Sequence, residues 1–362
     1  MVGDGRAAGI CARCGWRQGG YLPPASGSQH ARRGFKRADV KRGSSGAAEA
    51  RERKKSGASK GKKPMNKETF RGKSAVIDVG SNSVRLMFVA GGKVLYKTLE
   101  TTRLGEGLAF SSRLKDEAMR RTAEAISAFV ARGKAEGAQR VYAYATAAVR
   151  EAENRVEFRE LVRNLCGAEL EVIGGEEEAA LGMDGALKGA DGATIDVGGA
   201  STEIAVRSGG KTAYKKSVPV GVVRIKDLCG RDVAAIKNLC EKYVSGFIGA
   251  KTVIKQAGGK AIAIGGTATT LGARKAGLKE YDGAKVTGVP LTQSDLRGYA
   301  KAFLALPVGE IEKLPCMPKK RADVIGGGAA WLYAIAEYLD LSEILVSDED
   351  NLEGYARKVG IL

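Results

Sequence analysis

The sequence predicts an α/β fold made of two halves that begin alike. Each half opens with an apolar strand that ends in Asp-Val-Gly, at 78–80 and at 196–198. Two more strand-like segments follow each of these turns, and helical and strand patterns then alternate. No apolar run reaches the ~18 residues that a membrane helix needs, so a globular protein without a membrane span is expected.

The first half is predicted to extend over residues 71–189. It opens with a buried strand, its hairpin partner and a third strand, because three β-prone runs follow one another across short turns. Apolar residues at helical spacing then predict an amphipathic helix. The predicted elements are strands at 74–79, 83–89 and 93–98, a helix at 114–137, a strand at 140–145, helices at 147–152 and 154–166, a strand at 169–173 and a helix at 176–188.

The second half, residues 190–362, repeats this opening. The repeated order of strand, Asp-Gly turn, strand and strand indicates an internal duplication with its boundary near 189–191. The predicted elements are strands at 192–197, 201–207 and 211–217, helices at 222–228 and 232–257, a strand at 260–264, helices at 267–275 and 321–339, and a strand at 343–347.

Residues 1–70 carry most of the positive charge. They hold 17 Lys and Arg against 5 Asp and Glu, a balance of +12 within the +18 of the chain. Their Gly-, Ser- and Ala-rich composition predicts a disordered tail, which could bind nucleic acid, an acidic membrane or another polyanion. Alternatively, Met65 is the true start and the tail is absent from the protein. Cys11 and Cys14 lack a convincing fourth ligand, so no metal site is expected there.

The only histidine, His30, lies in this tail. Ser-His-Asp catalysis, Cys-His catalysis and histidine-bound metal are therefore excluded from the rest of the chain. Acid–base chemistry there must come from Asp, Glu or Lys. The N-terminus also lacks the apolar core of a signal peptide, which predicts a cytoplasmic protein.

Two similar turns are the main candidates for a phosphate site. They occupy residues 77–83 and 195–203, and each places an Asp, Asp78 or Asp196, at the end of a buried strand. Consecutive backbone N–H groups in such a turn form an anion-binding nest. The carboxylates suit a bridging Mg²⁺ held through water. Either turn alone could be an ordinary hairpin, but together they would grip a phosphate across a cleft.

Three other features are weaker candidates. Gly266 and Thr267 form a turn at a helix start, which favours anions but is also a common N-cap pattern. Glu178 ends an acidic run that could merely complement a helix dipole. Arg85 and Arg150 are candidate phosphate clamps, since a guanidinium group matches phosphate oxygens, or else surface arginines.

Taken together, these residues resemble the exopolyphosphatase and guanosine pentaphosphate phosphatase (Ppx/GppA) family. The resemblance extends over about residues 72–350, and TRLGEGL and GEEEA are its more specific motifs, because DxG turns occur in many actin-like ATPases. The matching stretches are AVIDVGSNSVRLMF at 75–88, TRLGEGL at 102–108, ATAAVREAENRVEF at 145–158, VIGGEEEAALG at 172–182, DVGGASTEI at 196–204, VPVGVVR at 218–224, GGTATTL at 265–271 and KRADVIGGG at 320–328.

The resemblance implies a two-lobed actin-like ATPase (ribonuclease H-like) fold with an interdomain cleft, Mg²⁺ as cofactor and a homodimer. It implies that Glu178 is the catalytic base and that Asp78, Asp196 and Glu203 hold the metal. Ala200 departs from the family pattern, which usually has Gly there. The expected phosphate-binding residues are Ser81, Asn82, Ser83, Arg85, Arg150, Gly198, Gly199, Ala200, Ser201, Gly266, Thr267 and Arg321.

Several functions remain open at this point. The resemblance implies release of terminal phosphate from polyphosphate or from pppGpp, and both substrates present a terminal phosphoanhydride to the same loops. The alternatives are an ATP-dependent kinase or ATPase on the same fold, and a non-enzymatic polyphosphate or alarmone sensor. Nucleic-acid binding would depend on the basic tail and would weaken with salt.

Overall fold

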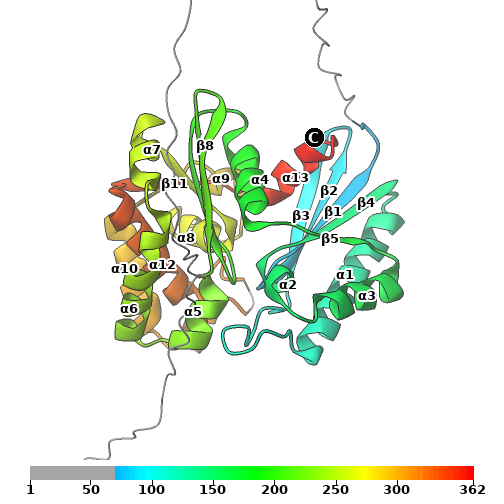
Figure 1. The fold of residues 1–362 in the computed structure, drawn as a ribbon, viewed down its shortest axis with the longest axis horizontal. Helices are drawn as coiled ribbons and strands as arrows, with labels where there is room; N and C mark the ends of the chain where they lie inside the picture. The colour runs from blue at the N-terminus through cyan, green and yellow to red at the C-terminus, as the bar shows by residue number, and fades with distance from the viewer. Residues whose placement is uncertain (1–69, 319) are drawn as a thin grey trace, which may run out of the picture. The chain divides into compact units, whose positions relative to one another are not determined.

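The computed structural model describes residues 70–318 and 320–362, which form two mixed β-sheets with helices packed on them (Figure 1). The expected α/β class is thereby confirmed. None of the helices in this described part is long and apolar enough to cross a membrane. The predictions for the basic tail, Cys11, Cys14, His30 and Met65 concern residues outside the described part.

The first sheet has the strand order β3-β2-β1-β4-β5. Its central strand β1 is fully buried, antiparallel to β2 and parallel to β4. Helices α1 and α3 lie side by side against this sheet (Figure 1). The elements are β1 (Ser74–Val79), β2 (Ser83–Ala90), β3 (Lys93–Thr101), α1 (Asp116–Ala135), β4 (Arg140–Ala145), α2 (Ala147–Glu151), α3 (Arg155–Cys166) and β5 (Leu170–Val172).

The second sheet repeats this plan and adds an edge strand, with the order β10-β11-β9-β6-β7-β8. Its strand β6 is buried, antiparallel to β7 and parallel to β9, as β1 is to β2 and β4. The predicted duplication is therefore confirmed, and the duplicated arrangement is the expected actin-like fold. The strands are β6 (Gly192–Val197), β7 (Thr202–Ser208), β8 (Lys211–Val218), β9 (Ala261–Ile264), β10 (Pro290–Thr292) and β11 (Glu343–Val346).

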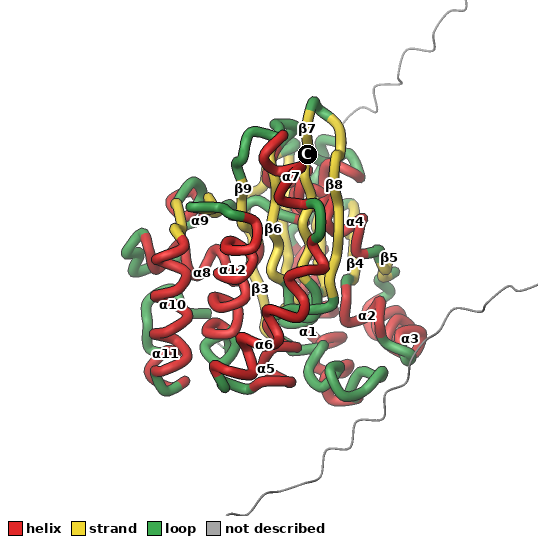
Figure 2. Tube along the Cα trace, turned by 60° about the vertical axis from the view of Figure 1, so that its left-hand side comes forward, coloured by secondary structure: helices red, strands yellow, loops and turns green. Residues whose placement is uncertain are grey.

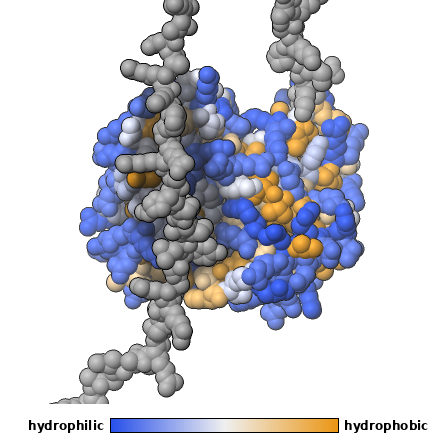
Figure 3. All heavy atoms as spheres, in the orientation of Figure 1, coloured by the Kyte–Doolittle hydropathy of each residue, from blue (hydrophilic) through white to orange (hydrophobic). Residues whose placement is uncertain are grey.

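Helix α12 (Ile325–Leu339) packs against α6 (Val233–Val244) and α10 (Gln293–Ala305), on the second sheet's side of the molecule (Figure 2). Its Trp331 is fully buried in the larger hydrophobic core. The other helices of this half are α5 (Val222–Cys229), α7 (Ala250–Gln256), α8 (Gly265–Lys275), α9 (Gly283–Val286) and α11 (Val308–Glu312). In Figure 3, hydrophilic side chains dominate the uncovered part of the visible face, and a group of apolar ones is visible in the half that holds the first sheet.

Two predicted helices were wrong in extent. The helix expected at 232–257 is two helices, because a 3₁₀ turn at Ser245–Phe247 and the left-handed Gly249 (φ 84°) interrupt it. The helix expected at 321–339 begins only at Ile325, since residues 321–324 form turns. Helices α9, α10 and α11 and strand β10 were not predicted, and neither was the last helix, α13 (Asn351–Lys358).

Helix α13 connects the end of the chain to the first sheet. Its Tyr355 stacks on Tyr144 of β4, with ring centroids 4.5 Å apart. It also crosses α4 (Gly175–Leu187), which packs on the second sheet. The crossing is close because it uses glycine: a Cβ at Gly185 would overlap the carbonyl of Asp350, and one at Gly354 would overlap the carbonyl of Leu181. The backbones of α4 and α13 are therefore in direct contact, whereas the predicted lobe boundary near 189–191 stays a prediction.

Candidate active site

A cavity of about 520 Å³ lies where the two sheets bring their matching turns together. The same hydrogen bond closes each turn, from Gly80 N to Ser83 O (3.0 Å) and from Gly198 N to Ser201 O (3.1 Å). The turns also approach each other closely, because a Cβ on Gly199 would lie 2.8 Å from the Cβ of Ser81. The two nests predicted from the sequence therefore face one shared space.

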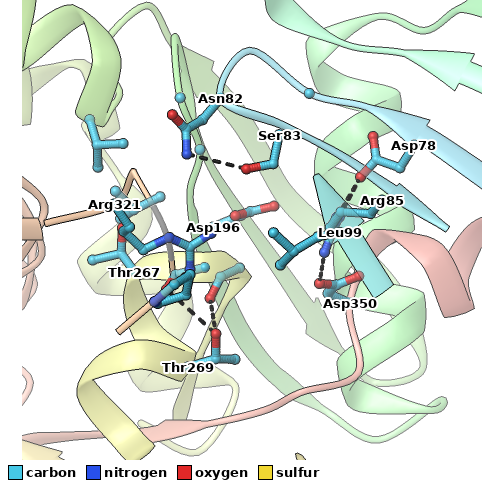
Figure 4. A pocket seen from close by; sticks show the side chains of 18 of the residues that line it. Asp78, Asn82, Ser83, Arg85, Leu99, Asp196, Thr267, Thr269, Arg321 and Asp350 are labelled. Carbon is cyan, nitrogen blue, oxygen red and sulfur yellow. Dashed lines mark hydrogen bonds and ion pairs between the residues drawn. The ribbon is translucent and has the colours of Figure 1, made fainter. Parts of the chain in front are cut away.

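Asp78 stands at the end of β1 and is 4% exposed. Its Oδ2 accepts a hydrogen bond from Arg85 Nε (3.0 Å), whereas its Oδ1 is buried and has no partner among the described residues. Arg85 also forms an ion pair with Asp350, so the guanidinium lies between two carboxylates (Figure 4). Burial raises the pKa of Asp78, and Arg85 only partly opposes it.

Asp350 shows the opposite balance. Burial would raise its pKa, but Arg85 and Lys97 together outweigh the burial, and the pKa of Asp350 is lowered. Asp350 is also the N-cap of α13, and its side chain accepts a hydrogen bond from Leu352 N. This carboxylate therefore remains charged and holds Arg85 beside Asp78.

Asp196 ends β6, in the position that matches Asp78. Its Oδ2 accepts a hydrogen bond from the Nδ2 of Asn351 (2.9 Å), the first residue of α13. Burial, followed by repulsion from Asp350, raises the pKa of Asp196 to about 6. The start of α13 thus contacts both Asp-Gly turns, one through Asp350 and Arg85 and the other through Asn351.

Glu178 lies in the first turn of α4 and faces the cavity. Arg150 Nη1 donates to its Oε2 (2.9 Å) and to the carbonyl of Ile173 (3.0 Å). Burial raises the pKa of Glu178 to about 7, against the opposing effect of Arg150. A carboxylate with this pKa is suited to accept a proton near neutral pH.

Glu203 lies on β7 and is 2% exposed. Its Oε1 accepts a hydrogen bond from Ser217 Oγ (2.7 Å), and its Oε2 is buried without a partner in the part of the chain that the structure describes. Burial raises the pKa of Glu203 well above its ordinary value, and the nearby charges of Glu178 and Asp196 add to the shift. The acidic side chains therefore act on one another electrostatically.

Arg321 provides positive charge on the other side of the cavity (Figure 4). The side chain is buried, and its Nη1 donates to Gly266 O (2.6 Å) and Thr270 Oγ1 (3.1 Å) at the start of α8. Within the described residues it pairs with no carboxylate. Burial lowers the pKa of Arg321 to about 10, and Arg85 adds to this effect. A buried cation without a counter-ion favours an anionic ligand.

Most of the predicted site residues line this cavity. They are Asp78, Ser81, Asn82, Ser83, Arg85, Glu178, Asp196, Gly198, Gly199, Ser201, Gly266, Thr267 and Arg321. Three do not line it: Arg150 contacts Glu178 from behind, Glu203 is buried beside Ser217, and Ala200 is buried within its turn. A contact of phosphate with Arg150 or Ala200 stays a prediction.

Sequence reasoning missed other residues that line the cavity, chiefly Lys97, Thr269, Tyr281, Asp348, Asp350 and Asn351. For Asp350 and Asn351, the sequence did contain a signal of local structure. Asp350 and Glu353 form a capping box, a pattern that marks a helix start. Nothing in the local sequence indicated that this start lies against Arg85, which is 265 positions away.

The donor set suits Mg²⁺ held through water. Within residues 70–318 and 320–362, the buried oxygens Asp78 Oδ1 and Glu203 Oε2 have no hydrogen-bond partner, and hydrated Mg²⁺ prefers carboxylate oxygens. Direct chelation is not supported, since no three His, Cys, Asp or Glu side chains of the described residues are grouped closely enough to hold a metal ion. The residues therefore fit a hydrated ion bound through one or two carboxylates.

The fold is actin-like, and its cavity is lined by glycine turns, buried carboxylates and Arg321, which pairs with no carboxylate of the described residues. This combination is typical of proteins that act on phosphoryl groups. Residues 77–356 match the Ppx/GppA phosphatase family, and the chain belongs to this family.

Two curated relatives and one solved structure illustrate the match. Exopolyphosphatase 2 of Mycobacterium tuberculosis is 30% identical over 310 residues, covering 78% of this chain and 97% of the relative. Guanosine-5'-triphosphate,3'-diphosphate pyrophosphatase of Pseudoalteromonas translucida is 28% identical over 302 residues, which are 80% of this chain and 58% of the relative. The crystal structure of the Aquifex aeolicus family member is 26% identical, with a TM-score of 0.63, and covers 80% of this chain and 97% of that one. These homologues include hydrolases of phosphoanhydride bonds.

Proposed function

We propose that this protein is an exopolyphosphatase, which releases the terminal phosphate of inorganic polyphosphate by attack of water. The observation that carries the proposal is Glu178, a buried carboxyl with a pKa of about 7 that faces the cavity between the two turns. The similarity to Exopolyphosphatase 2 of M. tuberculosis, over nearly the whole length of that relative, supports the same substrate class.

In this proposal the terminal phosphoryl group lies between the two turns. The backbone N–H groups of residues 81–83 and 199–201 and the Arg321 guanidinium bind its oxygens, which stabilises the charge of the transition state. Glu178 accepts a proton from the attacking water, and Arg150 orients the Glu178 carboxylate through its 2.9 Å hydrogen bond. The released group is inorganic phosphate, and the chain becomes one unit shorter.

Mg²⁺ completes the proposal. Asp78 and Asp196 would hold the ion through water, with Glu203 beside them. When bound, it would neutralise phosphoryl charge that these carboxylates would otherwise repel.

Replacing Glu178 tests the proposal directly. The Glu178→Gln variant is expected to lose on the order of 10²–10⁴-fold in turnover of polyphosphate, because a general base is removed without changing the shape of the side chain. Glu177→Gln is a matched control, since Glu177 lies on the same helical turn and pairs with Lys358 on the surface. Phosphate release is the readout. Unchanged turnover in Glu178→Gln would contradict the role of this residue, and binding of polyphosphate without any release would favour a sensor.

A second candidate substrate is pppGpp, and one observation favours it. Beyond the turns, the cavity is lined by Leu99, Tyr281 and Met317, and Tyr281 is 49% exposed. Aromatic and apolar side chains of this kind can stack on a nucleobase, a contact worth about 1–3 kcal/mol. If pppGpp is the substrate, Tyr281→Ala will raise the KM for pppGpp about tenfold or more, and the KM for short polyphosphate will not change. Purified protein assayed side by side on short polyphosphate, long polyphosphate and pppGpp decides between the two.

The kinase alternative and the homodimer are tested separately. Calorimetric titration with ATP detects the nucleotide binding that a kinase or ATPase would require. Sedimentation of the purified protein measures whether two chains associate, as the family resemblance implies.

A further inference from the structure

A second, smaller pocket lies beside the catalytic carboxylates. It has a volume of about 310 Å³ and is lined by residues of three segments: Arg150 and Glu151 of α2, Glu176 of α4, and Lys216 and Ser217 of β8. We refer to these five residues as the side pocket. None of them lines the large cavity, so the two spaces are distinct.

One layer of side chains separates the side pocket from the site. Arg150 lines the side pocket and donates to Glu178, which lines the large cavity. Ser217 lines the side pocket and donates to the buried Glu203 (2.7 Å). The wall therefore consists of two hydrogen-bonded pairs, and both pairs include a glutamate assigned to the reaction. Arg150 keeps 22% of its side chain exposed although it contacts a buried carboxylate, so its guanidinium lies at the boundary of the two spaces.

The charge of the side pocket suits a small anion. Its two outer acids are paired with bases at the rim: Glu151 with Arg224 (2.5 Å) and Glu176 with Lys215 (3.1 Å). Lys216 is exposed and forms no ion pair within the described part of the chain. With the rim acids paired and Arg150 paired with Glu178, the charge of Lys216 leaves the pocket attractive to a phosphate-sized anion, and the Arg150 guanidinium can also bind this anion once it leaves Glu178.

The reaction creates a need for a second route. Polyphosphate enters the large cavity by its end, so the phosphate that is cut off lies deeper than the remaining chain. If the chain stays bound, the product cannot leave along the route by which the chain entered. We propose that the side pocket is the exit site for inorganic phosphate, opened when the Arg150 side chain moves away from Glu178. This inference rests on the proposed exopolyphosphatase function.

A bulky residue at Lys216 tests the exit. Lys216→Trp places a large ring at an exposed position of an edge strand, where it narrows the pocket without entering the core. Lys211→Trp is the matched control, because Lys211 is an exposed lysine at the other end of the same strand. With long-chain polyphosphate in excess over the protein, rapid quenching measures bond cleavage through the first turnovers, and a fluorescent phosphate sensor measures release of the product.

The expected result is that Lys216→Trp cleaves at the wild-type rate but releases phosphate about threefold more slowly or worse, since product release can limit turnover. In the quench assay, a burst of one cleaved phosphate per active site should then precede a slower phase that is limited by phosphate release. Lys216→Glu should likewise slow release relative to cleavage, because it repels the leaving anion. If both Lys216 variants release phosphate at the wild-type rate, the exit is overturned. It is also overturned if Lys211→Trp slows phosphate release as much as Lys216→Trp does, or if bond cleavage slows by the same factor as phosphate release. If the wild-type protein cleaves no polyphosphate, the proposed function itself is overturned. The quench assay on the wild-type protein, done before any variant is tested, distinguishes this outcome.

Discussion

The two Asp-Gly turns have the same backbone but different surroundings. Gly80 and Gly198 make equivalent hydrogen bonds, and Asp78 and Asp196 end equivalent strands. Asp78, however, is held by a cation, Arg85, whereas Asp196 is held by a neutral amide, Asn351.

The residues of the turns differ as well. The first turn carries Ser81 and Asn82, which add a side-chain hydroxyl and an amide, where the second carries Gly199 and Ala200. Both turns end in a serine, Ser83 and Ser201. The duplication thus preserved the geometry that a phosphoryl group needs, while charge and hydrogen bonding diverged around it. Substitutions of the two aspartates, of Asn351 and of Asp350 test this difference between the turns.

The largest effect is expected from the two aspartates themselves. If both turns contribute equally to the reaction, Asp78→Asn and Asp196→Asn should each lower turnover by on the order of 10²-fold or more, since each removes a charged group that organises the transition state. Turnover at saturating Mg²⁺ and substrate is the measurement. A large loss in one variant and none in the other would show that a single turn carries the chemistry.

A smaller effect is expected from the amide that orients Asp196. Asn351→Leu removes the hydrogen bond to Asp196 Oδ2. If Asp196 holds Mg²⁺ as proposed, this change should lower activity about 10- to 100-fold, the usual effect of removing a group that orients a metal-binding carboxylate. The Mg²⁺ concentration needed for half activation should rise as well. Glu349→Gln serves as the control, because Glu349 is half-buried close to Asn351 but pairs with Lys188 and Arg357 and does not line the cavity. An unchanged Mg²⁺ requirement would remove Asn351 from the site.

The smallest effect is expected on the free energy of unfolding of Asp196→Asn, measured without Mg²⁺, and on how this free energy changes with pH. The pKa of Asp196 is about 6 in the folded protein and 3.8 in the unfolded reference, so folding stability falls as the pH rises from about 4 to 6. Asp196→Asn lacks this loss and should be more stable than wild type at pH 8, by about 1–3 kcal/mol, with no advantage below pH 4.

Asp350→Asn should behave in the opposite way, because the pKa of Asp350 is lowered and its charged form stabilises the fold. Chemical denaturation of each variant in EDTA at the two pH values measures both effects. If Asp196→Asn is less stable than wild type at pH 8, burial of the charged Asp196 carboxylate does not destabilise the fold as inferred.

The strands and turns of both halves could be predicted because their signals are local. The apolar runs at 74–79 and 192–197 and the Asp-Val-Gly turns that follow them are contained in the sequence itself, and the structure confirms both strands. A buried strand next to a small-residue turn requires no information from distant parts of the chain.

The remaining features depend on contacts between distant residues. Asp350 and Asn351 contact Arg85 and Asp196, which are 265 and 155 positions away. Arg150 was predicted to be a phosphate clamp or a surface arginine, and its contact with Glu178, 28 positions away, could not be read from either segment. The break in the helix expected at 232–257 depends on a left-handed glycine, whose conformation is not evident from a helical pattern.

The glycine contact between α4 and α13 has a consequence for how this site can change over evolution. The helix that carries Glu178 and the helix that begins with Asp350 and Asn351 touch through their main chains, without side chains between them to absorb an error. A single methyl group at Gly185 or Gly354 would displace Glu178 relative to both aspartates at once. By contrast, Gly298 of α10 has open space around it. If Glu178 is the general base as proposed, sequence drift at the crossing is constrained by catalysis as much as by folding.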